Sequence, residues 1–478
     1  MQYISTRGAA AEKTFADILF EGYAADGGLY VPKEYPKVSL AELAQWRGLD
    51  YAGFAWRTFS LFWPELDSNK LWSLCRDCFQ PNHYPFGRDR FKHEVAPTTW
   101  LHDGVGIMEL ANGPTLTFDD HSMRFLMLAN ERELAGPQTE RVLLGATTGD
   151  MGASCEHFFA DKPGVKVVML APKGRMTRFQ EAQLYSCLAE NVLNIEVDGT
   201  FDDCQDIVTA LLTDEDFRKA NRLNAVNTVL WARIATQVVC YFYAYVNAVE
   251  KLGEDVVFTV PAGNFGNAFA GWVAKKMGLP IMRIIIATNE NDAMDRFMRT
   301  GTYAPRPSSE TVLTSSPSMD ISRAANFERF LFEVLDRRAD RVSALMAQLR
   351  EEGSFTLEPE EFAKVRRSVF TSGTSTHADR LEIMESMHVE YHALVDPHTA
   401  DCLYSGIYLH PVGVRTICFE TVQPLKSRRI VEESTGVRME APEAFRGLAD
   451  RAQKRTASPA DKAAAAALIE AFAQGKAV

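Results

Sequence analysis

The chain has 478 residues, and 46% of them are hydrophobic, an ordinary fraction for a globular protein with a large core. At about 150 residues per domain, this length predicts roughly three domains or subdomains. The 51 basic and 63 acidic residues give a net charge of −12, which argues against a nucleic-acid-binding protein. The sequence has no apolar run of about 18 residues and no signal-peptide pattern, so we expect a cytoplasmic protein without a membrane segment.

The first 95 residues are rich in aromatic side chains and lack an alternation of strands and helices. We therefore predict a mainly helical N-terminal domain over residues 1–95. Within it, Cys75 and Cys78 form a lone C-x-x-C pair. No second pair with metal-site spacing accompanies it, so two ordinary helical positions are favoured over a redox or structural role.

A strand, loop, helix, strand order begins near residue 141 and returns near residue 256. Apolar runs at 141–144, 165–170, 256–260 and 282–287 flank Gly-containing loops and helical stretches. Such alternation implies parallel sheets with helices on both faces. Right-handed crossovers place both loops at the carboxyl ends of strands, where open α/β sheets bind ligands. The Ala-rich tail, 458–472, is predicted to be a packing helix.

Two of these loops suit anions. The segment Gly263-Asn264-Phe265-Gly266-Asn267 precedes a helix, where unpaired amides and the helix dipole favour a phosphate. The segment Thr147-Thr148-Gly149-Asp150 lies at another helix N-terminus and suits a carboxylate or a phosphate. Either loop alone could be a structural turn, but two in successive α/β units favour a cleft that binds two anions.

The ordered motifs resemble those of the threonine synthase family, fold-type II enzymes that use pyridoxal 5′-phosphate (PLP). The resemblance extends along nearly the whole chain and rests on these blocks: 3–8, 25–32, 112–118, 145–152, 263–267, 287–292, 316–322, 375–379, 396–401 and 420–421. It implies a tryptophan synthase β-like fold of parallel sheets flanked by helices. The implied domains are 1–95, a large PLP-type domain of 96–135 with 225–478, and a small α/β domain of 136–224.

The same resemblance assigns roles to residues. Gly263, Asn264, Phe265, Gly266 and Asn267 would bind the PLP phosphate, and Thr421 would face the pyridine nitrogen. The resemblance also implies that a second set of residues binds the substrate: Thr147, Thr148, Gly149, Asp150 and Met151.

The main departure from the family lies at Asp119. The family segment reads G-P-T-L-x-F-K-D, and its lysine forms the Schiff base with PLP; residues 113–120 place Asp119 at the lysine position. A carboxylate cannot form that bond. Four further departures are Thr148, Met151, Leu230 and Ala262, where the family usually has Ser, Thr, Asn and Ser. Because the changes gather at the site while the scaffold motifs remain, natural divergence is favoured over a single engineered substitution.

The residues around position 119 allow several roles. Asp119 could be a general base with a raised pKa in a closed cleft. It could instead hold Mg²⁺ or Mn²⁺ with Asp120 and His121, but no further ligands are visible, so we predict no metal site. Asp120 is expected to be structural, as a helix cap. His121 could act as an acid–base group, although a helix would turn it about 200° away from position 119, which favours packing.

Other basic residues are poor substitutes for the missing lysine. Solvated surface charges are expected at Lys162, Lys173, Lys275, Lys276 and Lys426. Structural hydrogen-bonding roles are expected at His157, His377 and His398.

These observations lead to three functional hypotheses. The first is a diverged threonine-synthase-like lyase that acts on a small amino-acid-like or phosphorylated substrate by elimination or replacement, with PLP held non-covalently or absent. The second is a non-catalytic protein that binds a metabolite or a partner. The third, true threonine synthase activity, requires a mechanism without the lysine. We expect a small-molecule partner, no nucleic acid, and a monomer or homodimer.

Overall fold

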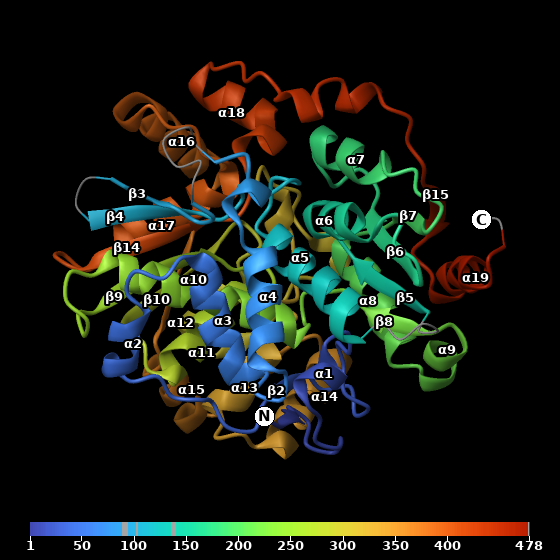
Figure 1. Cartoon of the computed structure of the whole chain (residues 1–478), viewed down its shortest axis with the longest axis horizontal. Coiled ribbons are helices and arrows are strands. Elements are labelled where there is room, and N and C mark those ends of the chain that lie inside the picture. Colours follow the sequence, from blue (N-terminus) through green and yellow to red (C-terminus); the bar gives the residue numbers. More distant parts are fainter. Residues whose placement is uncertain (88–93, 102–103, 135–139, 477) are drawn as a thin grey trace.

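The computed structural model describes residues 1–87, 94–101, 104–134, 140–476 and 478. Two sheets lie on either side of a central group of helices that includes α5 (Asp119–Ala129) and α6 (Asp150–Phe159), as Figure 1 shows. The N-terminal helices α3 and α4 lie beside this group. In the described part of the chain, no helix combines the length and apolar character needed to cross a membrane.

The N-terminal region is mainly helical, which confirms the prediction for its class. Its helices are α1 (Phe15–Ile18), α2 (Leu40–Trp46), α3 (Tyr51–Phe62) and α4 (Ser68–Cys78), and its strands β1 (Tyr3–Ser5) and β2 (Tyr30–Pro32) pair antiparallel. Aromatic rings join this region to the core: Phe59 stacks on Phe125 with ring centroids 4.0 Å apart. Cys75 and Cys78 are buried free thiols in α4, as expected of ordinary helical positions.

The larger sheet has the strand order β13-β10-β9-β14-β4-β3 and is parallel except at β3, which pairs antiparallel with β4. Helix α17 packs on β9, β10 and β14, and α11 also packs on β9 and β10. The runs predicted as buried strands are confirmed at β9 and β10. The strands are β3 (Thr98–Trp100), β4 (Val105–Glu109), β9 (Val256–Pro261), β10 (Ile281–Thr288), β13 (Phe370–Thr374) and β14 (Arg415–Glu420).

The smaller sheet is parallel throughout, in the order β15-β7-β6-β5-β8. Its strands are β5 (Arg141–Ala146), β6 (Val165–Pro172), β7 (Val192–Asp198), β8 (Leu223–Ala225) and β15 (Thr456–Pro459). The edge strand β15 pairs with β7. The predicted domains assign 225–478 to the large domain, so they do not anticipate a strand from this range in the smaller sheet. The tail therefore begins as a strand, and its helix starts only at Lys462, after the cap Asp461.

Helices connect and cover both sheets. They are α5 (Asp119–Ala129), α6 (Asp150–Phe159), α7 (Arg178–Tyr185), α8 (Phe201–Leu212), α9 (Glu215–Ala220), α10 (Trp231–Ala248), α11 (Gly266–Met277), α12 (Ala293–Thr300), α13 (Phe327–Val334), α14 (Ala339–Glu352), α15 (Pro359–Arg366), α16 (His377–Tyr391), α17 (Pro397–Leu409), α18 (Arg428–Thr435) and α19 (Lys462–Ala473). The short strands β11 (Thr302–Tyr303) and β12 (Phe355–Thr356) pair antiparallel. Together these elements form the α/β architecture that the sequence predicts.

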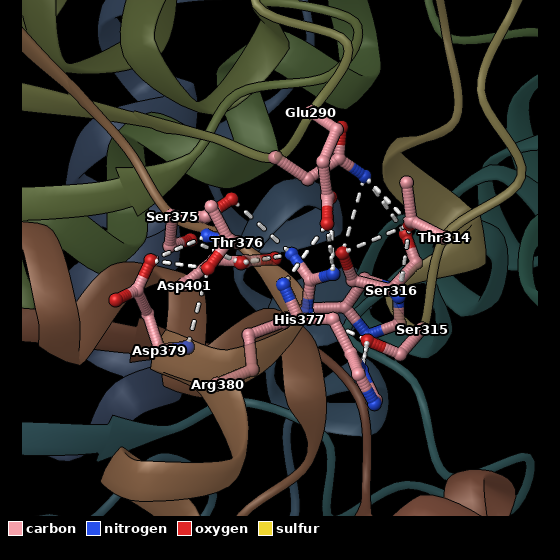
Figure 2. A network of polar contacts seen from close by, with 12 residues as sticks. Glu290, Thr314, Ser315, Ser316, Ser375, Thr376, His377, Asp379, Arg380 and Asp401 are labelled. Carbon is pink, nitrogen blue, oxygen red and sulfur yellow. Dashed lines mark hydrogen bonds and ion pairs between the residues drawn. The ribbon is translucent and has the colours of Figure 1, made fainter.

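A buried polar network centred on Arg380 ties the ends of β10 and β13 to α16 and α17, as Figure 2 shows. The Arg380 guanidinium donates to Asp401 Oδ1 at 3.0 Å and to Glu290 Oε1 at 2.9 Å, and its Nε donates to Ser315 Oγ at 2.7 Å. Asn289 extends the network, because its Nδ2 donates to Ser316 Oγ at 3.1 Å. The segment 314–320 is thereby held at the carboxyl end of the larger sheet.

Removing the Arg380 side chain should destabilise the fold strongly. The Arg380 and Asp401 side chains are both fully buried, so Arg380→Leu would leave Asp401 without its cation. We expect the free energy of unfolding to fall by about 3–5 kcal/mol, measured by urea denaturation. Lys219→Met, which breaks an exposed pair with Glu215, is the control and should change it by less than about 1 kcal/mol. Equal effects of the two substitutions would contradict this role for the network.

Candidate active site

A cavity of about 80 Å³ lies at the carboxyl ends of strands from both sheets. Both predicted anion loops contribute to its wall, together with the start of α5 and the start of α10. Its lining residues are Thr117, Phe118, Asp119, Ala146, Thr147, Thr148, Asp150, Met151, Phe201, Thr228, Arg233, Pro261, Gly263, Asn264, Asn267, Ser318, Met319, Ile321, His398, Thr421 and Val422. The structure therefore brings most of the predicted site residues to one place.

The loop 263–267 connects β9 to α11 and presents free amides. Helix α11 begins at Gly266 with no side-chain cap, and Phe265 adopts a left-handed conformation with φ 63°. Gly266 donates to Asn264 Oδ1 at 2.8 Å, whereas the amides of Asn264, Phe265 and Asn267 have no hydrogen-bond acceptor among the described residues. A Cβ at position 263 would lie 3.1 Å from the Met319 Cα, a tight contact that favours glycine there. This arrangement suits a phosphate.

The loop 147–151 connects β5 to α6 in a similar way. Thr147 Oγ1 accepts from the amides of Gly149 and Gly152, each at 2.9 Å, and Gly149 has φ 110°. In the described part of the chain, the amides of Thr148, Asp150 and Met151 have no acceptor. They can receive a second anion at the N-terminus of α6.

The Asp150 side chain anchors this second loop. Its Oδ1 accepts from Lys426 Nζ at 2.7 Å, and its Oδ2 accepts from Gln180 Nε2 at 2.9 Å and from Ser318 Oγ at 2.5 Å. Burial alone would raise the pKa of Asp150, but the Lys426 ammonium and the hydrogen bonds outweigh it and lower that pKa. Asp150 is therefore a charged structural group that holds the loop.

Lys426 is not the solvated surface charge that the sequence suggests. It follows β14 in a short turn and is 1% exposed, and Asp150 is its partner. Lys426 is buried because the buried Asp150 carboxylate requires a cation. The sequence around Lys426 does not indicate this, because the two residues are 276 positions apart. Lys426 does not line the cavity itself.

Asp119, the first residue of α5, forms a buried ion pair with Arg233 of α10. The Asp119 side chain is 6% exposed and that of Arg233 is 3% exposed. Burial raises the pKa of Asp119 and the Arg233 charge opposes that rise, while Asp150 and Asp120 add to it. The second oxygen, Asp119 Oδ2, has only a 3.4 Å contact with Thr117 Oγ1. One carboxylate oxygen is thus engaged and the other is nearly free.

Asp120 is structural, in agreement with its predicted role, but it does not cap the helix. Its Oδ2 accepts from the Thr115 amide at 2.8 Å, and its Oδ1 accepts from the Thr115 hydroxyl and from Ser154 Oγ at 2.6 Å. A Cβ at Gly113 would lie 2.3 Å from Asp120 Oδ2. Asp120 therefore fastens the segment 113–115 to both α5 and α6.

His121 lies apart from the cavity, on the face of α5 that the helical rotation predicts. Its ring packs against Tyr51, Phe79 and Tyr84, and its Nε2 lies 3.1 Å from the Leu110 carbonyl oxygen. Burial lowers the pKa of His121 to about 3. This surrounding favours the packing role over the acid–base role.

His398 does line the cavity, although the sequence favours a structural role for it. Its Nδ1 lies 2.7 Å from Asp396 Oδ1, and its Nε2 accepts from the Ser318 amide at 3.0 Å. An Nε2 that accepts must be unprotonated, so the ring proton lies on Nδ1 toward Asp396. His398 therefore positions the Ser318 segment at the cavity edge.

The residues that sequence reasoning missed carried only faint signals. Arg233 is the only charged residue of α10, and an isolated charge in a buried helix indicates a partner elsewhere. Ser318 lies in one of the family-like blocks, 316–322, but its own residue type does not indicate its contact with Asp150. Leu230, one of the departures from the family pattern, is fully buried and does not line the cavity, whereas Met151 does.

The residues present fit the non-covalent part of PLP binding. The amides of Asn264, Phe265 and Asn267, which have no acceptor among the described residues, leave hydrogen-bond donors for a phosphate. Thr421 contributes a hydroxyl on the same cavity. The residue at position 119 does not fit a covalent bond to the cofactor. Within the described residues, no group of three His, Cys, Asp or Glu side chains could hold a metal ion.

Comparisons with known proteins agree with this geometry. Residues 2–79 match the family described as threonine synthase N terminus, and residues 107–348 match pyridoxal-phosphate dependent enzymes. The chain is 41% identical to a threonine synthase of Methylobacillus glycogenes over 474 residues, 99% of each chain. A threonine synthase of Corynebacterium glutamicum is also 41% identical, over 96% of each chain. The solved structure of PLP-bound threonine synthase from Brucella melitensis matches with a TM-score of 0.88 and 34% identity, covering 99% of this chain and 100% of that one.

The buried position of His121 predicts a pH-dependent stability. An unfolded histidine titrates near pH 6.5, whereas the folded pKa of His121 is about 3. As pH falls below about 6.5, the unfolded chain gains a proton that the folded chain excludes, so stability falls by up to about 1.4 kcal/mol per pH unit. His121→Phe should remove this contribution and flatten the decline, measured by urea denaturation at several pH values. Equal slopes for both proteins would contradict it.

The Asp119–Arg233 pair predicts strong coupling between the two side chains. Arg233→Met leaves Asp119 buried without a cation and should lower the free energy of unfolding by about 3–5 kcal/mol. Adding Asp119→Leu should recover most of that loss, because two apolar side chains need no charge compensation. Urea denaturation of the wild type, both single variants and the double variant measures the coupling. Additive effects would show that the pair does not act as a unit.

Proposed function

The chain belongs to the threonine synthase family, and we propose that it is a diverged member that performs lyase-type chemistry without a covalent cofactor lysine. The proposed substrate is a small amino acid or amino-acid-like molecule that carries a phosphate. One observation carries the proposal: both anion loops are kept open at the cavity, while Asp119 stands where the family pattern has the lysine.

The loop 263–267 and Thr421 would hold PLP through its phosphate and its ring, without a bond to the protein. Support comes from the free amides at the N-terminus of α11 and from the Thr421 position on the same cavity. When bound, PLP supplies an electron-withdrawing ring for elimination and replacement at an amino acid.

The loop 147–151 would bind the substrate's own anionic group. Its free amides at Thr148, Asp150 and Met151 point to a carboxylate or phosphate as the ligand. Asp150 keeps the loop in place through Lys426 and Ser318. A hydroxyl-bearing Thr148 and an apolar Met151 would then shape the pocket around the rest of the substrate.

Asp119 would serve as the proton acceptor at the reacting centre. Its Oδ1 is held by Arg233, whereas its Oδ2 is nearly free and can accept or return a proton. The pKa of Asp119 is raised by burial, which brings a carboxylate closer to the range useful for general acid–base chemistry. Arg233 orients the carboxylate and limits that rise.

A second candidate function, non-catalytic ligand binding, is favoured by the same ion pair. Arg233 compensates the Asp119 charge, and a carboxylate held in this way is a weaker base than an unpaired one. In that case the anion loops would bind a phosphorylated metabolite for sensing. Ligand stabilisation without turnover would identify this function.

The proposed function is tested by a substrate screen. Purified protein would be incubated with O-phosphohomoserine and related phosphorylated amino acids, with and without PLP, and phosphate release would be followed. We expect release by the wild type and at least a hundredfold slower release by Asp119→Asn, since general acid–base groups contribute about 10²–10⁴-fold. Ligand-induced thermal stabilisation with no release favours the binding function. If the protein shows no turnover and no ligand-induced stabilisation, both proposed functions are contradicted.

Asp119→Lys should restore covalent PLP attachment if the phosphate cradle is intact. Arg233 would then lie beside the introduced amine and lower its pKa, which favours a nucleophilic neutral amine. We expect a new PLP absorbance band that borohydride reduction makes permanent in this variant. Asp119→Met is the matched control and should not gain the band. Failure of Asp119→Lys to bind PLP at all would mean that the cavity has been rebuilt around another ligand.

A further inference from the structure

A second cavity lies at the other end of the smaller sheet, between the N-terminal segment 13–25 and helices α8 and α9. It has a volume of about 350 Å³, within the range of roughly 300–1,000 Å³ that is usual for small-molecule sites. It shares no lining residue with the candidate active site. We propose that this cavity, named here the Arg141 pocket, binds a small organic anion through the Arg141 guanidinium.

Arg141 is a buried cation without an acid partner. It is the first residue of β5 and is only 9% exposed, and its guanidinium lies 5.2 Å from the centre of the Phe20 ring. Within the described residues it has no ion pair or side-chain hydrogen bond, and burial lowers the pKa of Arg141 accordingly. A guanidinium removed from water without an anion is unfavourable, so an incoming carboxylate or phosphate would supply the missing partner.

The acidic residues on the wall do not fill that role. Glu21 pairs with Lys13 and accepts from the Tyr30 hydroxyl at 2.8 Å. Glu215 pairs with Lys219 on the exposed face of α9. Both carboxylates are therefore engaged away from Arg141.

Three cations and three carboxylates line the pocket, and the cations differ in how they are paired. Arg218 also lines the cavity and, among the described residues, forms no ion pair. The carboxylate of Asp17 is exposed and accepts from the amide and hydroxyl of Thr14 as part of the cap of α1. All three carboxylates thus have other partners, whereas Arg141 and Arg218 have no ion pair among the described residues, which favours an anionic ligand over a cationic one.

The backbone around the pocket is suited to the same ligand. The amides of Gly22 and Tyr23 have no acceptor among the described residues, and both residues line the cavity. At Gly22 a Cβ would lie 2.8 Å from the Ala225 Cβ, so a glycine there lets this loop pack against β8. The wall therefore combines free amides, a buried guanidinium and a second arginine, a set of donors that binds carboxylate and phosphate groups.

The Arg141 pocket is separated from the candidate active site by the length of β5. Strand β5 begins at Arg141 and ends at Ala146, directly before the loop 147–151 of the candidate active site. The strand is paired on both sides, with β6 and β8. The two anion sites thus lie at opposite ends of one strand, so a ligand in the Arg141 pocket would not compete for the candidate active site.

Binding is tested with two probes, inorganic phosphate and succinate, at constant ionic strength against chloride. Hydrogen exchange followed by mass spectrometry would report protection of peptides that cover 13–25 and 141–146, and calorimetry would report affinity. We expect at least one probe to protect both peptides, and Arg141→Gln to weaken that binding by about tenfold or more, whereas binding at the 263–267 loop persists. A preference for phosphate or for succinate identifies which acid group the ligand carries.

Arg222→Gln is the matched control, because Arg222 is a nearby surface arginine paired with Glu140. It should leave the protection and the affinity within about twofold of the wild type. The proposal is overturned if neither probe protects the two peptides, or if Arg141→Gln and Arg222→Gln have the same effect. Thermal midpoints of both variants would show that they are folded.

Discussion

Buried charge compensation at the junction of the two sheets is the constraint on which the rest of the site depends. Asp119 and Asp150 are both withdrawn from water, and each has one cation within reach, Arg233 and Lys426. Removing ions from water costs several kcal/mol each, so the four side chains hold one another in place. The pairs join α5 to α10 and α6 to the segment after β14, and the Asp150–Lys426 pair holds the loop 147–151 at the cavity.

Much of the fold could be predicted, because its signals are local. Apolar runs such as 256–260 and the helix N-terminus at Gly266 lie next to each other in sequence, so the strand, loop and helix order can be read directly. The edge strand β15 could not be predicted in this way. It is four residues long, and its pairing with β7 joins residues that lie far apart in sequence, such as Thr456 and Ile195.

In the site, too, features set by neighbouring residues could be predicted, whereas contacts between residues far apart in sequence could not. The loops 147–151 and 263–267 were predicted from their own residues, and the rotation of α5 correctly separated His121 from Asp119. Arg233 and Lys426 were missed because their partners lie 114 and 276 positions away. A charge in an apolar helix shows that a partner exists, but only the packing of the two sheets shows which residue it is.

The central proposal is that the cavity keeps its anion sites while lacking covalent attachment of PLP. The most direct test is the intact mass of the wild-type protein after incubation with PLP and borohydride. The account predicts a mass that includes the non-covalently held cofactor, its aldehyde reduced to an alcohol, under native conditions, and the mass of the bare chain after denaturation. A PLP mass that survives denaturation and maps to a lysine in or beside the cavity, such as Lys426, would contradict it.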